Sequence, residues 1–221
     1  MEVRHKFNEQ MSDIYQQILR MGALIEEALQ KSLSAIKQHD EVLAQQVIDQ
    51  DVQIDEFQTR IEDLCTMVIA TEQPVASDLR EIVTMIKVVS DLERIGDHAR
   101  HLAKAVSRVR EQITARVLPH LERMTNLGIG MVHNALTALA NRDAEQAKLI
   151  VMQDDDMDRL NSELQDLLVS IMKQSPDLIE EGTTLIFINR LLERLGDHVT
   201  NMCEWIIYAR QGSHTVDTRL L

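Results

Sequence analysis

Apolar residues recur every three or four positions over long stretches of the chain, which is the spacing of one face of an α-helix. Two of these stretches carry especially regular stripes of the same length. The first stripe consists of Met85, Val88, Leu92, Ile95, Ala99, Leu102 and Val106, and the second of Leu185, Ile188, Leu192, Leu195, Val199, Met202 and Ile206. Such stripes bury against neighbouring helices at shallow crossing angles, so the pattern predicts helical bundles.

The three prolines of the chain lie between the periodic stretches and indicate helix boundaries. Six helices are therefore predicted, over residues 7–38, 41–70, 77–111, 117–141, 144–173 and 176–210. Their expected N-terminal caps are Asp40, Ser77, Asp143 and Ser175. Aspartate and serine are favoured there because their side chains accept hydrogen bonds from the free N–H groups of the first turn. The expected fold class is all-α.

The last helix of each half contains the same short motif. Residues 91–98 read Asp-Leu-Glu-Arg-Ile-Gly-Asp-His, and residues 191–198 read Leu-Leu-Glu-Arg-Leu-Gly-Asp-His. Further upstream, the aspartates at 40, 51 and 55 recur with the same spacing at 143, 154 and 158. Repetition over this length indicates internal duplication. We therefore expect two tandem three-helix bundles, with domains at residues 1–112 and 113–221.

The amino-acid composition supports a helical, globular chain and limits the classes of partner that it can bind. Only 3% of the residues are aromatic, and the formal net charge is −13, from 36 acidic and 23 basic side chains. A chain this acidic repels the phosphates of nucleic acid unless one face is strongly basic, and no basic run provides such a face. We expect no nucleic-acid binding, and we expect basic protein surfaces or cations as partners.

The cysteines and the N-terminal residues predict a cytoplasmic protein. Cys65 and Cys203 are far apart and have no metal-binding spacing, which is typical of reduced core residues. The first residues contain no apolar stretch resembling a signal peptide, and no apolar run approaches the ~20 residues that span a bilayer. Contact with a membrane is expected only through partner proteins.

Acidic residues four positions apart are the main candidate site. Such pairs lie one above the other on a helix, where like charges cost roughly 0.2–0.5 kcal/mol per pair. The pairs are Asp51 and Asp55, Glu93 and Asp97, Asp154 and Asp158, and Glu193 and Asp197. If the second and third helices of each half are antiparallel neighbours, these acids converge into oxygen-rich clusters. Mg²⁺, Mn²⁺, iron or Zn²⁺ would neutralise such clusters.

The alternative interpretation is that the acids form the solvated edge of amphipathic helices. In the first half Arg100 and Lys104 share the acidic ridge, whereas the second half has Thr200 and Glu204 there and Asn189 one turn before Glu193. The second half is therefore the better metal candidate.

Several neighbouring residues of the repeated motif are expected to have structural roles. For His98 and His198 we expect a polar or interhelical role rather than ligation, and for Arg94 and Arg194 interhelical salt bridges. The repeated glycines at 96 and 196 indicate close helix approach, because glycine inside a helix costs about 1 kcal/mol relative to alanine.

No catalytic motif is present. The sequence lacks a glycine-rich phosphate loop, a nucleophile elbow and a Cys/His zinc pattern. A non-enzymatic regulator is therefore favoured. Two alternatives stay open: a metal-dependent hydrolase or redox enzyme built on the carboxylate clusters, and a purely structural helical scaffold.

The repeated Leu-Glu-Arg-Ile/Leu-Gly-Asp motif, the upstream Asp-x-x-x-Asp pairs and the duplicated halves resemble the PhoU family of phosphate transport regulators. The resemblance runs from about residue 7 to residue 210. It implies a cytoplasmic, commonly dimeric protein that contacts the ATPase of the phosphate ABC transporter and a phosphate-sensing histidine kinase. It also implies repression of phosphate uptake and of the phosphate-starvation response, and multinuclear metal clusters on the eight acidic residues named above.

Overall fold

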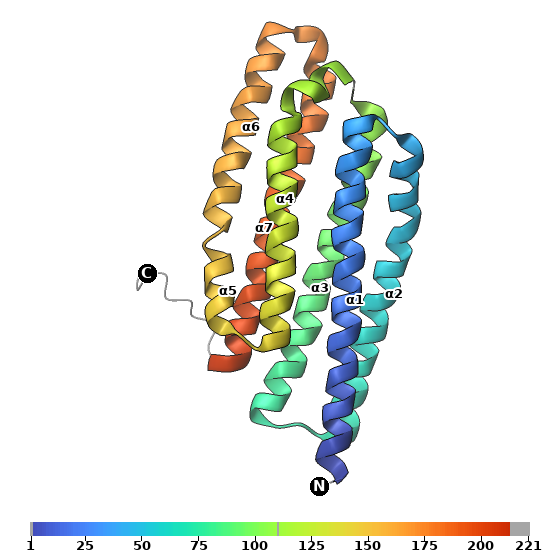
Figure 1. The fold of residues 1–221 in the computed structure, drawn as a ribbon, viewed down its shortest axis with the longest axis vertical. Helices are drawn as coiled ribbons and strands as arrows, with labels where there is room; N and C mark the ends of the chain where they lie inside the picture. Colours follow the sequence, from blue (N-terminus) through green and yellow to red (C-terminus); the bar gives the residue numbers. More distant parts are fainter. Residues whose placement is uncertain (1, 110, 213–221) are drawn as a thin grey trace.

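The computed structural model describes residues 2–109 and 111–212, and over these residues the chain is all-α with no strand. The helices of the first half are α1 (Glu2–Gln38), α2 (Glu41–Glu72) and α3 (Ala76–Lys104). Those of the second half are α4 (Glu111–Asn141), α5 (Ala144–Val151), α6 (Asp154–Gln174) and α7 (Ile179–Gln211). Two single 3₁₀ turns, η1 (Val106–Arg108) and η2 (Pro176–Leu178), follow α3 and α6. Figure 1 shows the long helices side by side along one axis.

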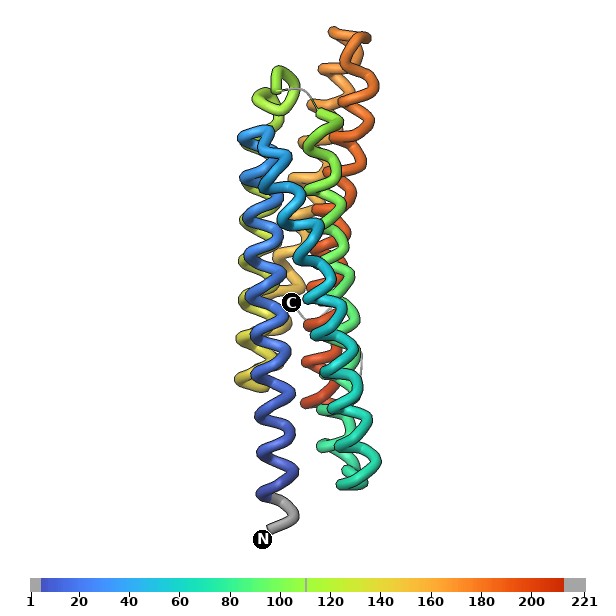
Figure 2. Tube along the Cα trace, turned by 90° about the vertical axis from the view of Figure 1, so that its right-hand side faces the viewer, coloured from blue at the N-terminus to red at the C-terminus, as the bar shows by residue number. Residues whose placement is uncertain are grey.

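The two halves pack against each other through their first and third helices. The most extensive contact between elements joins α3 to α7, and α1 packs on α4. These four helices form the centre of the molecule, as Figures 1 and 2 show. Helix α2 flanks the centre on α1 and α3, while α5 and α6 flank it on α4 and α7. With α5 and α6 counted together as the interrupted second helix of its half, each half is the expected three-helix unit, and the two units share one elongated bundle.

The predicted stripes of α3 and α7 form the middle of the core. Every residue of both stripes is buried, and they belong to a single cluster of apolar side chains that extends through both halves. Burial of this much apolar surface is the main favourable term in folding. The helical pattern of the sequence is confirmed by this packing.

Some predicted helix ends were wrong. Helix α3 ends at Lys104 rather than at residue 111, and α4 already begins at Glu111. Pro119 consequently lies inside α4, because a proline removes one backbone donor without always ending a helix, and buried neighbours such as Val117 and Leu121 hold this turn in place.

The N-terminal caps were predicted with mixed success. Asp40 and Asp143 cap α2 and α5: the Asp40 side chain accepts from the backbone N–H of Leu43, and the Asp143 side chain accepts from that of Gln146. The Ser77 cap was wrong because α3 begins one residue before it, and the side chain of Ser175 makes no cap hydrogen bond.

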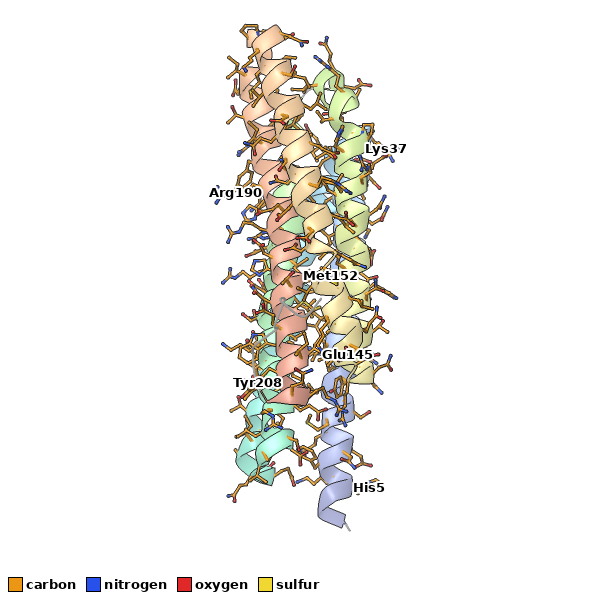
Figure 3. The ribbon with its side chains drawn as sticks, turned by 90° about the vertical axis from the view of Figure 1, so that its left-hand side faces the viewer. His5, Lys37, Glu145, Met152, Arg190 and Tyr208 are labelled. Carbon is orange, nitrogen blue, oxygen red and sulfur yellow. The ribbon has the colours of Figure 1, made fainter. Side chains whose placement is uncertain are left out.

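The predicted helix 144–173 is interrupted between α5 and α6. At the break, Gln153 N donates to Ile150 O at 2.9 Å, the tighter spacing of a 3₁₀ turn. Figure 3 labels Met152 at this point. The corresponding part of α2 is continuous, so the break distinguishes the second half from the first and makes Asp154 the first residue of α6.

The predicted division into domains at residues 112 and 113 falls within the first turn of α4 and stays a prediction. None of the helices formed by residues 2–109 and 111–212 is long and apolar enough to cross a bilayer.

Candidate functional site

The second-half acids lie where α6 runs antiparallel to α7. Asn189 Nδ2 of α7 donates to the backbone oxygen of Asn161 of α6 at 2.9 Å, which fixes the register of the two helices. Two turns away, a Cβ added to Gly196 would approach Asp154 Oδ1 to 2.5 Å. Glycine therefore allows Asp154 to pack directly against α7, beside Asp197. The close helix approach predicted from the repeated glycines is confirmed here.

This register brings the four second-half acids together, and we call Asp154, Asp158, Glu193 and Asp197 the second cluster. Burial, together with the charges of Asp158, Asp197 and Glu193, raises the pKa of Asp154 to about 6. Burial also raises the pKa of Glu193, with Asp197 and Asp158 adding to the effect. Arg190 and Arg194 offset part of this effect at Glu193. A group of carboxylates whose pKa values are raised in this way is stabilised by a bound cation.

The first-half acids, Asp51, Asp55, Glu93 and Asp97, also lie together between α2 and α3, and we call them the first cluster. Burial raises the pKa of Asp51 and of Glu93, and Asp55 and Asp97 act on both. In this half, however, a basic side chain lies within the cluster. Arg100 Nη1 is 2.9 Å from Asp51 Oδ2, and Arg100 Nη2 donates to Asp97.

The arginines of the repeated motif make different contacts from its histidines. Arg94 pairs with Glu93 and Asp97 of its own helix, at 3.4 and 3.3 Å, so the predicted interhelical salt bridge of Arg94 was wrong. Its exposed position on α3 leaves its own helix as the nearest source of acids. The salt bridge of Arg194 stays a prediction.

The interhelical role of the two histidines is confirmed. The rings of His98 on α3 and His198 on α7 lie 5.4 Å apart between centroids, and His198 Nδ1 is 2.9 Å from Asp91 Oδ1. These residues therefore join the two halves at their main contact.

Two further oxygen atoms of α7 favour a ligand at the second cluster. Asn189 is 2% exposed and its Oδ1 atom has no hydrogen-bond partner, and the buried Thr200 Oγ1 atom is likewise unpartnered. Both residues share the face of α7 that carries Glu193 and Asp197, because positions four or seven apart align on a helix. Buried polar oxygens normally have a partner, so these atoms are fitting ligands or neighbours for a cation.

In the arrangement observed for residues 2–109 and 111–212, no three histidine, cysteine, aspartate or glutamate side chains are placed to hold a metal ion. The eight predicted ligands are brought together as two groups of four, and metal binding by them stays a prediction.

Sequence reasoning missed a third polar group, at the end of the bundle where α1, α3, α4 and α7 meet. Tyr15 Oη donates to Glu81 Oε1 at 2.6 Å, and Arg142 pairs with the same carboxylate. These residues line a cavity of about 260 Å³. Burial and the nearby Glu81 raise the pKa of Tyr15. No local signal marks this group, since its members come from distant parts of the chain.

Two repeats of three helices, each with a carboxylate cluster between its second and third helices, define a class of duplicated helical-bundle proteins. The family model described as the PhoU domain matches this chain twice, over residues 18–106 and 121–206, one match in each half. The chain therefore belongs to the PhoU family.

Relatives at full length agree with this assignment. A "Phosphate-specific transport system accessory protein PhoU homolog" from Clostridium acetobutylicum is 34% identical, covering 95% of this chain and 96% of the relative. The protein called "Phosphate-specific transport system accessory protein PhoU" in Serratia marcescens is 33% identical, covering 94% of this chain and 85% of the relative.

Solved structures show the same fold. The crystal structure of the phosphate transport system regulatory protein PhoU from Streptococcus pneumoniae matches with a TM-score of 0.88 and 31% identity, covering 95% of this chain and 99% of that one. PhoU from Pseudomonas aeruginosa matches with a TM-score of 0.86 and 33% identity, covering 94% of this chain and all of that one. These relatives have the names of accessory and regulatory proteins of phosphate transport, not of enzymes.

Proposed function

We propose that this protein regulates phosphate uptake and the phosphate-starvation response by binding other proteins, without catalysis of its own. The observation that carries the proposal is similarity over nearly the full length of both chains to accessory proteins of the phosphate-specific transport system. A helical bundle with a long, acidic surface and no catalytic motif is suited to such a role, since net charge of −13 steers basic protein surfaces toward it.

The proposed partners are the ATPase subunit of the phosphate ABC transporter and a phosphate-sensing histidine kinase. The protein acts on both as a negative regulator from the cytoplasm, reaches the membrane only through them and works as a homodimer. Support for the transporter comes from the names of the relatives, and the kinase and the dimer follow from the family resemblance of the sequence.

Affinity capture of the intact protein from cells grown in high and in low phosphate tests this proposal. We expect mass spectrometry to identify the transporter ATPase and the sensor kinase, with recovery that depends on phosphate supply. A deletion strain should also express phosphate-starvation genes when phosphate is plentiful, and the parent gene should restore repression. Recovery of neither partner under both conditions would contradict the proposal.

The second cluster is the proposed metal centre of this regulator. Asp154, Asp158, Glu193 and Asp197 would supply carboxylate oxygens, and the unpartnered oxygen of Asn189 adds a neutral donor close by. Mg²⁺, Mn²⁺, iron and Zn²⁺ accept such donors, and the ion would supply positive charge that lets all four carboxylates ionise. Metal content per chain should therefore fall in the double variant Asp154→Ala/Glu193→Ala.

A metal-dependent hydrolase or redox enzyme is the second candidate function. The observation in its favour is the raised pKa of Asp154, about 6, because perturbed carboxylates cluster at catalytic sites. Hydrolysis of phosphoesters or oxidation of Fe(II) that disappears in Glu193→Ala would favour an enzyme. If neither reaction occurs when Mn²⁺, Zn²⁺ or Fe(II) is supplied, the result favours the regulatory function.

A further inference from the structure

The two carboxylate clusters consist of corresponding residues of the repeat and have different basic neighbours. Both contain four acids from the second and third helices of a half. The first cluster also contains Arg100, whose place in the repeat is taken by Thr200 in the second. Lys104 near the first cluster is likewise replaced by Glu204. Two basic side chains in one half thus correspond to a neutral and an acidic one in the other.

Arg100 makes specific contacts in the first cluster. One arm of its guanidinium is 2.9 Å from the buried carboxylate of Asp51 on α2, and the other donates to Asp97 on α3. The side chain is 29% exposed, so its charge is screened less than that of a fully solvated arginine. A guanidinium that bridges two carboxylates from neighbouring helices supplies the positive charge that a bound cation would supply.

At the corresponding place in the second half, the hydroxyl oxygen of Thr200 is buried without a partner. Gly196 there lies against both Asp154 and Met157, whereas the nearest atoms to the matching Gly96 belong to the apolar Ile54 and Ile25. The second cluster therefore has free oxygens and no arginine in the position where the first has Arg100 paired with Asp51 and Asp97.

We propose that Arg100 is a permanent internal cation of the first cluster, which excludes metal from that half and restricts metal binding to the second cluster. For the second half, the inference rests on the metal binding proposed above for the second cluster. It departs from the expectation that both halves bind metal: a divalent ion placed among Asp51, Asp55, Glu93 and Asp97 would have to displace the guanidinium and would be repelled by it.

Exchange of the residues at 100 and 200 tests this inference. Arg100→Thr gives the first half the residue of the second, and Thr200→Arg does the reverse. The readout is the number of Mn²⁺ ions bound per chain, measured from the loss of the electron paramagnetic resonance signal of free Mn²⁺ during titration of the metal-free protein. Arg100→Lys keeps a cation at the position and is the matched control, and circular dichroism confirms that each variant is folded.

We expect Arg100→Thr to bind more Mn²⁺ per chain than the parent, and Arg100→Lys to bind the same amount as the parent. The gain should disappear when Asp51→Ala/Glu93→Ala is added, which assigns it to the first cluster. Thr200→Arg should bind less Mn²⁺ than the parent.

Two results would overturn the inference. One is equal binding by the parent and Arg100→Thr, and the other is loss of Mn²⁺ from the parent on Asp51→Ala/Glu93→Ala. A parent that binds no Mn²⁺ while Arg100→Thr does would support the role of Arg100 and contradict the proposed metal binding of the second cluster. The two proposals therefore fail in distinguishable ways.

Discussion

Replacing Asp154 by asparagine removes one negative charge from the second cluster and keeps the size of the side chain. In the metal-free protein this charge is unfavourable, because the carboxylate is partly buried and surrounded by Asp158, Asp197 and Glu193. We therefore expect Asp154→Asn to stabilise the metal-free protein, although the substitution removes a carboxylate from the candidate metal site.

The expected gain follows from the pKa of Asp154, which rises from 3.8 to about 6 on folding. At about 1.36 kcal/mol per pKa unit, the charged form costs at most about 3 kcal/mol at neutral pH. Partial exposure reduces this cost, and the loss of a negative charge at the N-terminus of α6 removes roughly 0.3–1 kcal/mol of favourable interaction with the helix dipole. A net gain of about 1 kcal/mol remains, or roughly 2–4 °C in Tm for a chain of this length.

The assay is urea denaturation in EDTA at pH 7.5 and pH 5, with Asp51→Asn as the matched control. Because the folded-state pKa is raised, the folded parent binds more protons than the unfolded chain between about pH 4 and 6, so its stability falls as pH rises through that window. The advantage of Asp154→Asn should thus be smaller at pH 5. Asp51→Asn should gain less, because it also breaks the pair with Arg100. Destabilisation by Asp154→Asn, or equal shifts in both variants, would refute the reasoning.

Other predictions concern the core and its polar contacts, each measured by chemical denaturation. Burial, together with the neighbouring histidine of α7, lowers the pKa of His98 from 6.5 to about 4. As the pH falls, the unfolded chain takes up its proton at this histidine before the folded protein does, so the free energy of unfolding of the parent should fall by about 3 kcal/mol between pH 6.5 and pH 4. The variant His98→Asn should not show this loss. Gly128→Ala should destabilise by about 1–3 kcal/mol, because its Cβ would lie 2.7 Å from a buried leucine of α7, while Gly130→Ala has open space and should stabilise by roughly 0.5–1 kcal/mol. Tyr15→Phe removes a 2.6 Å hydrogen bond to Glu81 and should cost about 1.5–3 kcal/mol, so an unchanged midpoint would contradict that role.

The fold could be predicted from the sequence because its strongest signals are local and repeated. The stripes of α3 and α7 are determined by helical periodicity, and Asp40 and Asp143 act as caps through contacts with residues three positions away. The break between α5 and α6 could not be predicted, since neither Met152 nor Gln153 disrupts a helix by itself. Pro119 was misleading for the opposite reason: packing holds the chain helical where local preference predicts an end.

The sequence predicted which residues belong to the candidate site better than it predicted the contacts that they make. Spacing of four placed each acidic pair on one helix face, and the duplication predicted two clusters. Which acids are neutralised depends on the register between helices: the pair of Asp51 with Arg100 joins α2 to α3, and sequence showed only that Arg100 lies on the acidic ridge. The cavity lined by Tyr15 and Arg142 depends on contacts between both halves, which no local pattern encodes.

The difference between Arg100 and Thr200 also affects how a partner protein can dock on the molecule. Duplication gives the molecule two corresponding helix pairs, α2 with α3 and α6 with α7. A partner that contacts the carboxylate cluster meets a paired arginine on one side and an uncharged threonine at the corresponding place on the other, so the two sides differ in local charge at this position. A protein built from a repeated unit thereby presents two faces that a partner can distinguish.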